Sequence, residues 1–78
     1  MDTTARTMVK WVQSSITTLA LNPAYGTKNA VYEEIASLAG VSISSVQKLY
    51  DGRSANPRAD TLDQMITAIK AMNRKIAA

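Results

Sequence analysis

The stretch AGVSISSVQKLYDG, residues 39–52, decides the fold, because it holds the signals that end one helix and bound the next. Gly40 readily takes the left-handed conformation in which helices often end. Ser42 can cap a new helix, which the pattern predicts over residues 43–50, and Asp51-Gly52 ends it. Serine is a mediocre helix former because its hydroxyl competes for the backbone. The serines at the front of this helix therefore need an explanation: Ser42, Ser44 and Ser45.

Upstream of this stretch, the sequence predicts two further helices. In the first, over about residues 4–21, apolar side chains recur at helical spacing. The connector NPAYGTKN, residues 22–29, stops this helix, since an Asn-Pro pair and a nearby glycine favour a turn. The second helix should run over about residues 30–39, with Thr27 or Asn29 as its cap.

Downstream, the loop RSANPRA, residues 53–59, precedes a last helix over about residues 60–76. Asp60 can cap this helix, and Asp63 stands in the position that completes a capping box. Its apolar side chains form a stripe at helical spacing: Leu62, Met65, Ile66, Ile69, Met72 and Ile76. We therefore predict one all-α domain over residues 1–78, compact and built from four to five helices.

Composition narrows the chemistry that this chain can perform. It has 78 residues, a net charge of +3, and neither cysteine nor histidine. Disulfides, thiolate chemistry and the usual zinc sites are excluded, and we expect no cofactor and no metal. The carboxylates are too scattered to form an acid–base pair, so we do not expect an enzyme: Asp2, Glu33, Glu34, Asp51, Asp60 and Asp63.

The sequence also bears on location. Its longest apolar run is far shorter than the roughly 18 residues of a membrane span, and its start lacks the basic-then-apolar layout of a signal peptide. We therefore expect a cytoplasmic domain with no membrane contact.

The segment over residues 30–51 carries a specific spacing. A small residue, Ala36, stands where two steeply crossing helices would touch, and Gly40 follows at the turn. Val41 and Val46 can then close a small shared core. This spacing is the sequence pattern of a DNA-binding helix-turn-helix.

The stretch EEIASLAGVSISSVQKLYDGRSANPRADTLDQMITAIKAM, residues 33–72, resembles the lambda-repressor-like, Cro-type helix-turn-helix family of phage and bacterial regulators. The matching pieces are IA-x-x-AGVS, a helix ending in DGR, then NP, then TL-x-x-x-x-x-AI. The chain departs from the family in its longer first helix. Its connector at residues 22–29 also replaces the short turn and the glutamine that commonly begins the second helix.

This resemblance implies that the helix over residues 43–50 enters the major groove, whose width of about 12 Å admits a helix. Lys48 would donate to a guanine edge, and Ile43 would pack against a thymine methyl. The base-reading set is Ile43, Ser44, Gln47 and Lys48. The phosphate-contacting set, which would fix the register without reading sequence, is Ser42, Ser45, Arg53, Asn56 and Arg58.

Plainer interpretations remain open. Ser42 and Ser45 can be a cap and a solvated position, and the basic side chains can serve solubility alone. Tyr50 either supports the end of its helix or reaches a phosphate, and Trp11 and Tyr32 are expected to pack.

Two hypotheses on function follow. The first is a sequence-specific transcriptional regulator, a repressor that acts as a homodimer on a palindromic operator of double-stranded DNA, with no small-molecule effector. Continuation of the last apolar stripe through Ile76 would leave surface for the dimer to bury. The second is a protein-interaction module on the same fold, such as a phage-encoded inhibitor or an antitoxin-like partner binder, which the exposed Ile43 permits.

Overall fold

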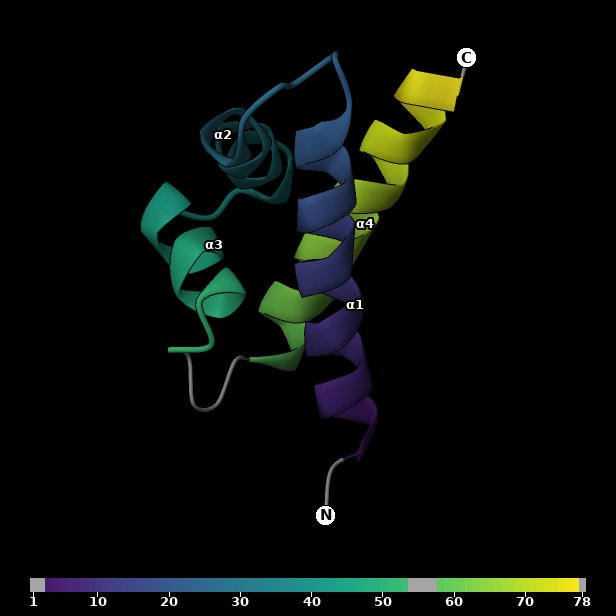
Figure 1. Cartoon of the computed structure of the whole chain (residues 1–78). Helices are drawn as coiled ribbons and strands as arrows, with labels where there is room; N and C mark the ends of the chain where they lie inside the picture. Colours follow the sequence, from purple (N-terminus) through teal and green to yellow (C-terminus); the bar gives the residue numbers. More distant parts are fainter. Residues whose placement is uncertain (1–2, 54–57, 78) are drawn as a thin grey trace.

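The computed structural model describes residues 3–53 and 58–77, and within these ranges it holds four helices and no strand. The helices are α1 (Thr3–Leu21), α2 (Lys28–Ala39), α3 (Ile43–Tyr50) and α4 (Ala59–Ala77). Figure 1 shows α1 beside α4, with α2 and α3 on one side of this pair. The prediction of a compact all-α domain is confirmed, with extents of 37 × 22 × 20 Å.

A backbone hydrogen bond in the turn after α1 and a side-chain cap before α2 set the end of α1 and the start of α2. After α1, the Gly26 N–H donates to the Asn22 carbonyl at 2.9 Å, which reverses the chain. α2 begins earlier than predicted, at Lys28, and of the two expected caps Thr27 is the one used. Its hydroxyl accepts from the Ala30 N–H at 3.2 Å.

The turn between α2 and α3 follows the prediction. Gly40 has φ of 70°, the left-handed region, and its N–H donates to the Ala36 carbonyl. The Val41 N–H donates to the same carbonyl at 3.1 Å. Ser42 then caps α3. The chain therefore passes from α2 into α3 with no more than three residues between them.

The predicted cap of the last helix is wrong. α4 begins at Ala59, so Asp60 lies in its first turn and cannot be the residue that precedes the helix. The predicted capping box with Asp63 is lost with it. The Leu62 N–H donates to the Arg58 carbonyl at 3.0 Å, which extends the helical pattern back to that residue. Asp60 still stabilises this end, since negative charge is favourable near a helix N-terminus.

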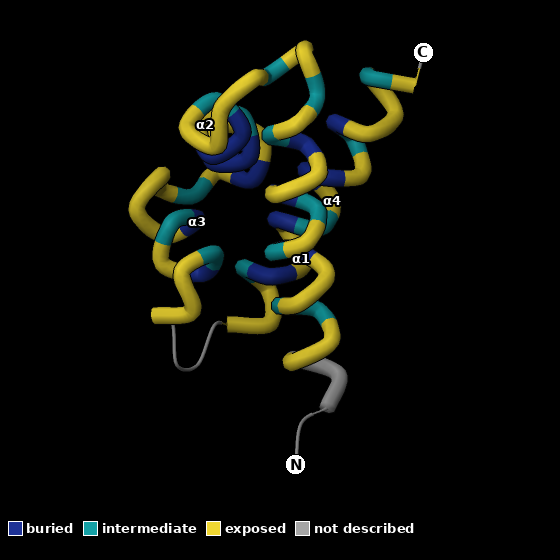
Figure 2. The backbone as a smooth tube through the Cα atoms, in the orientation of Figure 1, coloured by how far each residue is buried: buried dark blue, intermediate teal, exposed yellow. Residues whose placement is uncertain are grey.

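The apolar core lies between α1, α2 and α4, where Figure 2 shows the buried residues facing one another. Each of these helices contributes one fully buried isoleucine: Ile16, Ile35 and Ile69. α2 is viewed nearly end-on in Figure 1, so it crosses α1 steeply. Ile76 is half-buried against the core, so it leaves less uncovered surface than the sequence suggested.

α3 is attached on one side only. It packs against α1 and α2 through Val46 and Leu49, which are buried. Within the described residues, no Cα pair of α3 and α4 lies within 8 Å. The rest of α3 therefore stands at the edge of the molecule (Figure 1).

Across residues 3–53 and 58–77, no helix is both long and apolar enough to cross a membrane.

Candidate functional site

The serines at the start of α3 form a small hydrogen-bonded group. The Ser42 hydroxyl accepts from the Ser45 N–H at 3.1 Å, which is the predicted cap. The Ser42 and Ser45 hydroxyl oxygens lie 2.9 Å apart and share a hydrogen bond. When Ser45 donates this bond, the Ser42 O–H remains able to donate to a further acceptor. The group therefore stabilises the helix start and still presents a donor to the outside.

The outward face of α3 carries most of the predicted base-reading residues. Ser44 and Lys48 are exposed, and the Ile43 side chain keeps 43% of its surface exposed although it is a large apolar residue. Gln47 is half-buried, so it lies at the border of this face rather than in its centre. Within the described ranges, no ion pair holds Lys48.

The basic residues beyond α3 have acidic neighbours. The Arg53 guanidinium pairs with the Asp51 carboxylate at 2.8 Å, and the two side chains are 71% and 41% exposed. Arg58 lies 3.7 Å from Asp60 and is exposed. Pairs this exposed contribute little to stability and exchange readily, so both cations remain accessible to another anion. Asn56, the remaining predicted phosphate contact, lies outside the described residues.

The C-terminal end of α3 is capped by a side chain from α1. The Gln13 amide donates to the carbonyls of Leu49 and Tyr50, at 3.0 and 3.4 Å. These two carbonyls belong to the last turn of α3, where the regular helical hydrogen bonds end, and the Leu49 carbonyl also accepts from the Gly52 N–H at 3.2 Å. Gln13 is not among the functional residues predicted from the sequence. The only signal was a long polar side chain one position away from an apolar stripe.

Tyr50 links three helices at the same end. Its hydroxyl shares a hydrogen bond of 3.0 Å with Thr17 of α1. Its ring packs against the buried Tyr32 ring of α2, with centroids 5.9 Å apart. The Lys28 ammonium of α2 lies 4.7 Å from the Tyr50 ring centroid. Of the two roles left open for Tyr50, support of the helix end is therefore confirmed.

These neighbours shift the acidity of the groups involved. Hydrogen bonding to Lys28, and then to Thr17, lowers the pKa of the Tyr50 phenol. Hydrogen bonding to Tyr50 raises the pKa of Lys28 above its usual 10.5. Lys28 therefore stays charged over the whole physiological pH range.

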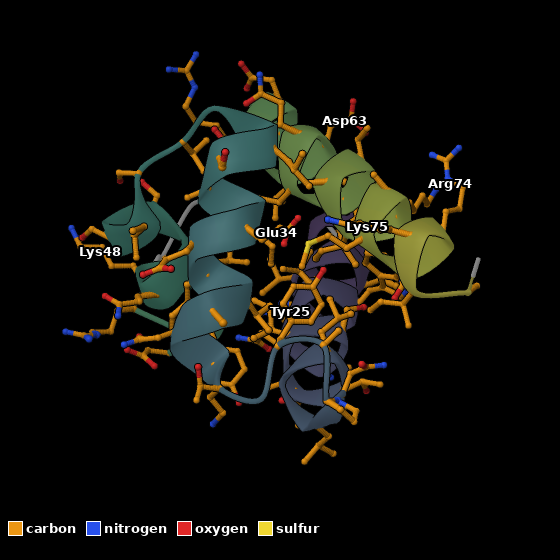
Figure 3. All side chains as sticks on the ribbon, turned by 90° about the horizontal axis from the view of Figure 1, so that it is seen from above. Tyr25, Glu34, Lys48, Asp63, Arg74 and Lys75 are labelled. Atoms are coloured by element: carbon orange, nitrogen blue, oxygen red, sulfur yellow. The ribbon has the colours of Figure 1, made fainter. Side chains whose placement is uncertain are left out.

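A second cluster lies away from α3, between α2 and α4. Lys75 of α4 pairs with Glu34 of α2 at 3.6 Å. Burial, together with the charge and hydrogen bonding of Glu34, raises the pKa of Tyr25. Figure 3 shows these three residues grouped together, with Lys48 at one edge of the molecule and Arg74 at the opposite edge. The exposed end of α3 and the basic end of α4 are thus separate surfaces.

Within residues 3–53 and 58–77, no three carboxylates, histidines or cysteines gather where a metal ion could be held.

Comparisons of the chain with protein-family models, with curated proteins and with solved structures found no match.

Proposed function

We propose that α2, the turn at Gly40 and α3 form a DNA-binding helix-turn-helix of the lambda-repressor-like type, and that the chain is a sequence-specific transcriptional regulator. One observation carries this proposal. Two buried side chains, Val46 and Leu49, attach α3 to the core, and the other face of α3 is exposed at the edge of the molecule. A helix so placed can enter a groove without displacing any other part of the described chain.

The exposed residues suit the edges of base pairs. Ser44 is short, so the backbone of α3 can approach the groove floor, and its hydroxyl can donate or accept. Lys48 can donate to the O6 and N7 atoms of guanine. Ile43 can pack against the methyl group of thymine, which explains an apolar side chain left 43% exposed.

Arg53, Arg58 and Ser42 would hold the phosphates on either side. Such contacts release counterions, so they add affinity for any sequence and make binding sensitive to salt. Arg53 would exchange its exposed pairing with Asp51 for a phosphate, at little cost because the existing pair is open to water.

Repression through a homodimer completes the proposal. One helix in one groove offers few base contacts, and two half-sites about 34 Å apart supply the affinity that specific sites need. A dimer bound at a promoter would then block polymerase, and this requires no catalysis by the chain. Ile76 contributes little apolar surface for pairing, because it is packed against the core. Selection of bound fragments from random duplex DNA tests this step, since a palindrome is expected.

Two single substitutions test the assigned roles. Lys48→Ala should weaken binding and change base preference at one position, by about 1–3 kcal/mol. Arg53→Ala should weaken binding to all sequences alike and reduce the salt slope by about one unit. Gel-shift titrations against selected and random duplexes, at several salt concentrations, measure both effects. Equal losses on both duplexes for both variants would contradict the two roles.

A second candidate function has one observation in its favour. Leu38 and Ile43 flank the turn between α2 and α3, and these residues keep 53% and 43% of their surface exposed. An apolar pair at this place would also suit a protein partner. The same titrations separate the two candidates: a chain that binds no DNA even at low salt would favour the protein partner.

A further inference from the structure

The position of Lys28 differs from that of an ordinary surface lysine. Its ammonium lies 4.7 Å from the centre of the Tyr50 ring, a cation–π distance. The ring itself is fixed from two sides, by the Thr17 hydroxyl at 3.0 Å and by the Tyr32 ring at 5.9 Å. The ammonium therefore lies against this ring beside the C-terminal end of α3, although the side chain is exposed.

A shallow, open depression lies at the same end of α3. Hydroxyl and amide groups of α1 line it together with the end of α3: Gln13, Ser14, Thr17, Tyr50 and Asp51. The exposed Ser14 hydroxyl suits the sugar-phosphate backbone of a nucleic acid, whereas the Gln13 amide and the Thr17 hydroxyl already bond to α3. The negative charge of Asp51 at the rim is matched by Arg53 at 2.8 Å.

Resting on the DNA-binding function proposed above, we infer that Lys28 is a phosphate-contacting residue of the same surface, held in register with α3 by the Tyr50 ring. Lys28 is not among the DNA-contacting residues predicted from the sequence. Its place follows from three contacts made by Tyr50, each to a residue on another helix.

The arrangement gives Lys28 a function that a flexible lysine lacks. A free lysine loses side-chain entropy when it binds a phosphate, whereas Lys28 has lost part of that freedom already. Because the ring belongs to α3, the ammonium moves with this helix. A phosphate bound to Lys28 therefore sets how the C-terminal end of α3 lies over the groove, while Ser42 acts at the other end.

The inference is tested by removing the positive charge of Lys28 and comparing the result with removal of the positive charge of Arg74. Lys28→Gln should weaken binding to random duplex DNA severalfold and reduce the salt slope by about one unit. Arg74→Gln is the matched control, because Arg74 is exposed at the edge of the molecule opposite to Lys48 of α3 (Figure 3). It should leave the slope unchanged. Circular dichroism verifies that both variants are folded.

The role of the ring is tested by a double-mutant cycle. Tyr50→Leu should weaken binding less than Lys28→Gln, and the double variant should bind no more weakly than Lys28→Gln alone. Tyr50→Phe keeps a ring under the ammonium and should retain most of the affinity. If Tyr50→Leu does not fold, Lys28→Gln alone decides the phosphate contact, and a loss of affinity in Tyr50→Phe as large as that in Lys28→Gln would contradict positioning by the ring.

The outcomes separate the inference from the function on which it rests. If the unaltered chain shows no salt-sensitive binding to duplex DNA, the DNA-binding function is wrong. If the unaltered chain binds and Lys28→Gln has the same salt slope as Arg74→Gln, the role of Lys28 is wrong and the function stands. Strictly additive losses in the cycle would show that the ring does not position Lys28.

Discussion

At the scale of single residues, the three tyrosines differ in what surrounds their hydroxyl groups. Hydrogen bonds to Lys28 and Thr17 stabilise the ionised form of Tyr50, so the pKa of Tyr50 lies below the usual 10.0. Burial raises the pKa of Tyr25 and of Tyr32 above that value, and nearby carboxylates, Glu34 and Asp51, raise them further. The order in which the phenols ionise therefore reports on three separate contacts.

We predict that Tyr50 ionises first when the pH is raised. An ultraviolet absorbance titration should resolve one phenol below pH 10.0 and two above it. Tyr50→Phe should remove the early phase, and Lys28→Gln should move it to higher pH because the favourable cation is gone. An early phase that persists in Tyr50→Phe would assign the low pKa to another tyrosine.

The same shifts predict how stability changes in alkali. Tyr25 and Tyr32 have folded-state pKa values above the unfolded value of 10.0, so the unfolded chain loses these protons first. Their contribution to stability is complete below pH 10 and is lost as the pH rises through the folded-state values. Urea unfolding at a series of alkaline pH values should show this fall, and Tyr25→Phe should make it shallower.

At the scale of elements, α3 depends on its surroundings. With eight residues, it is far below the roughly 12–15 residues at which an isolated helix becomes marginally stable. Ser42 satisfies its start, Val46 and Leu49 bury one face, and Gln13 of α1 serves its last carbonyls. The element that the proposed function requires is therefore supported from three directions.

Removal of the Gln13 amide should loosen the C-terminal end of α3. We predict that Gln13→Ala lowers the free energy of unfolding by about 0.5–1.5 kcal/mol, the usual effect of losing one hydrogen bond. Hydrogen exchange should increase most in the last turn of α3. Ser14→Ala is the neighbouring control, since this side chain is exposed and alanine favours helix. Equal exchange in both variants would show that Gln13 does not cap α3.

At the scale of the whole molecule, stability depends on a small core. For a chain of 78 residues, we expect a free energy of unfolding of about 4–12 kcal/mol. Its core combines long side chains from α1, α2 and α4, and the described residues bury no polar side chain in it. The loss of one large core side chain is therefore a large part of the total.

Two substitutions in α1 show this dependence. Ile16 is fully buried, whereas the Leu21 side chain keeps 82% of its surface exposed. Ile16→Ala should cost about 2–5 kcal/mol and leave much of the chain unfolded in mild denaturant. Leu21→Ala should change stability by less than about 0.5 kcal/mol. Urea unfolding followed by circular dichroism measures both, and similar midpoints would contradict the described core.

Much of this architecture follows from local features of the sequence. The positive φ that only glycine adopts easily ends α2 at Gly40, and the spacing of apolar side chains marks the buried faces of α1 and α4. Ser42 as a cap follows from its place just after Gly40, where α2 ends, and at the start of the next helical segment. The prediction of Asp60 as a cap failed because the helix continues back to Ala59, and several neighbouring residues could have begun it.

The contacts that support α3 were decided by tertiary structure alone. Gln13 is 36 residues away from Leu49 along the chain, and Thr17 is 33 residues away from Tyr50. Such pairs meet only because α1, α2 and α3 pack at particular angles. Periodicity tells which face of a helix is apolar and is silent on which polar side chain lies opposite another helix. The sequence by itself thus determined the order of the helices, the cap at Ser42 and the outward face of α3, and it narrowed the cap of α2 to Thr27 or Asn29 but misplaced that of α4. The packing of whole helices, which sums many distant contacts, determined Lys28 over Tyr50 and the half-burial of Gln47.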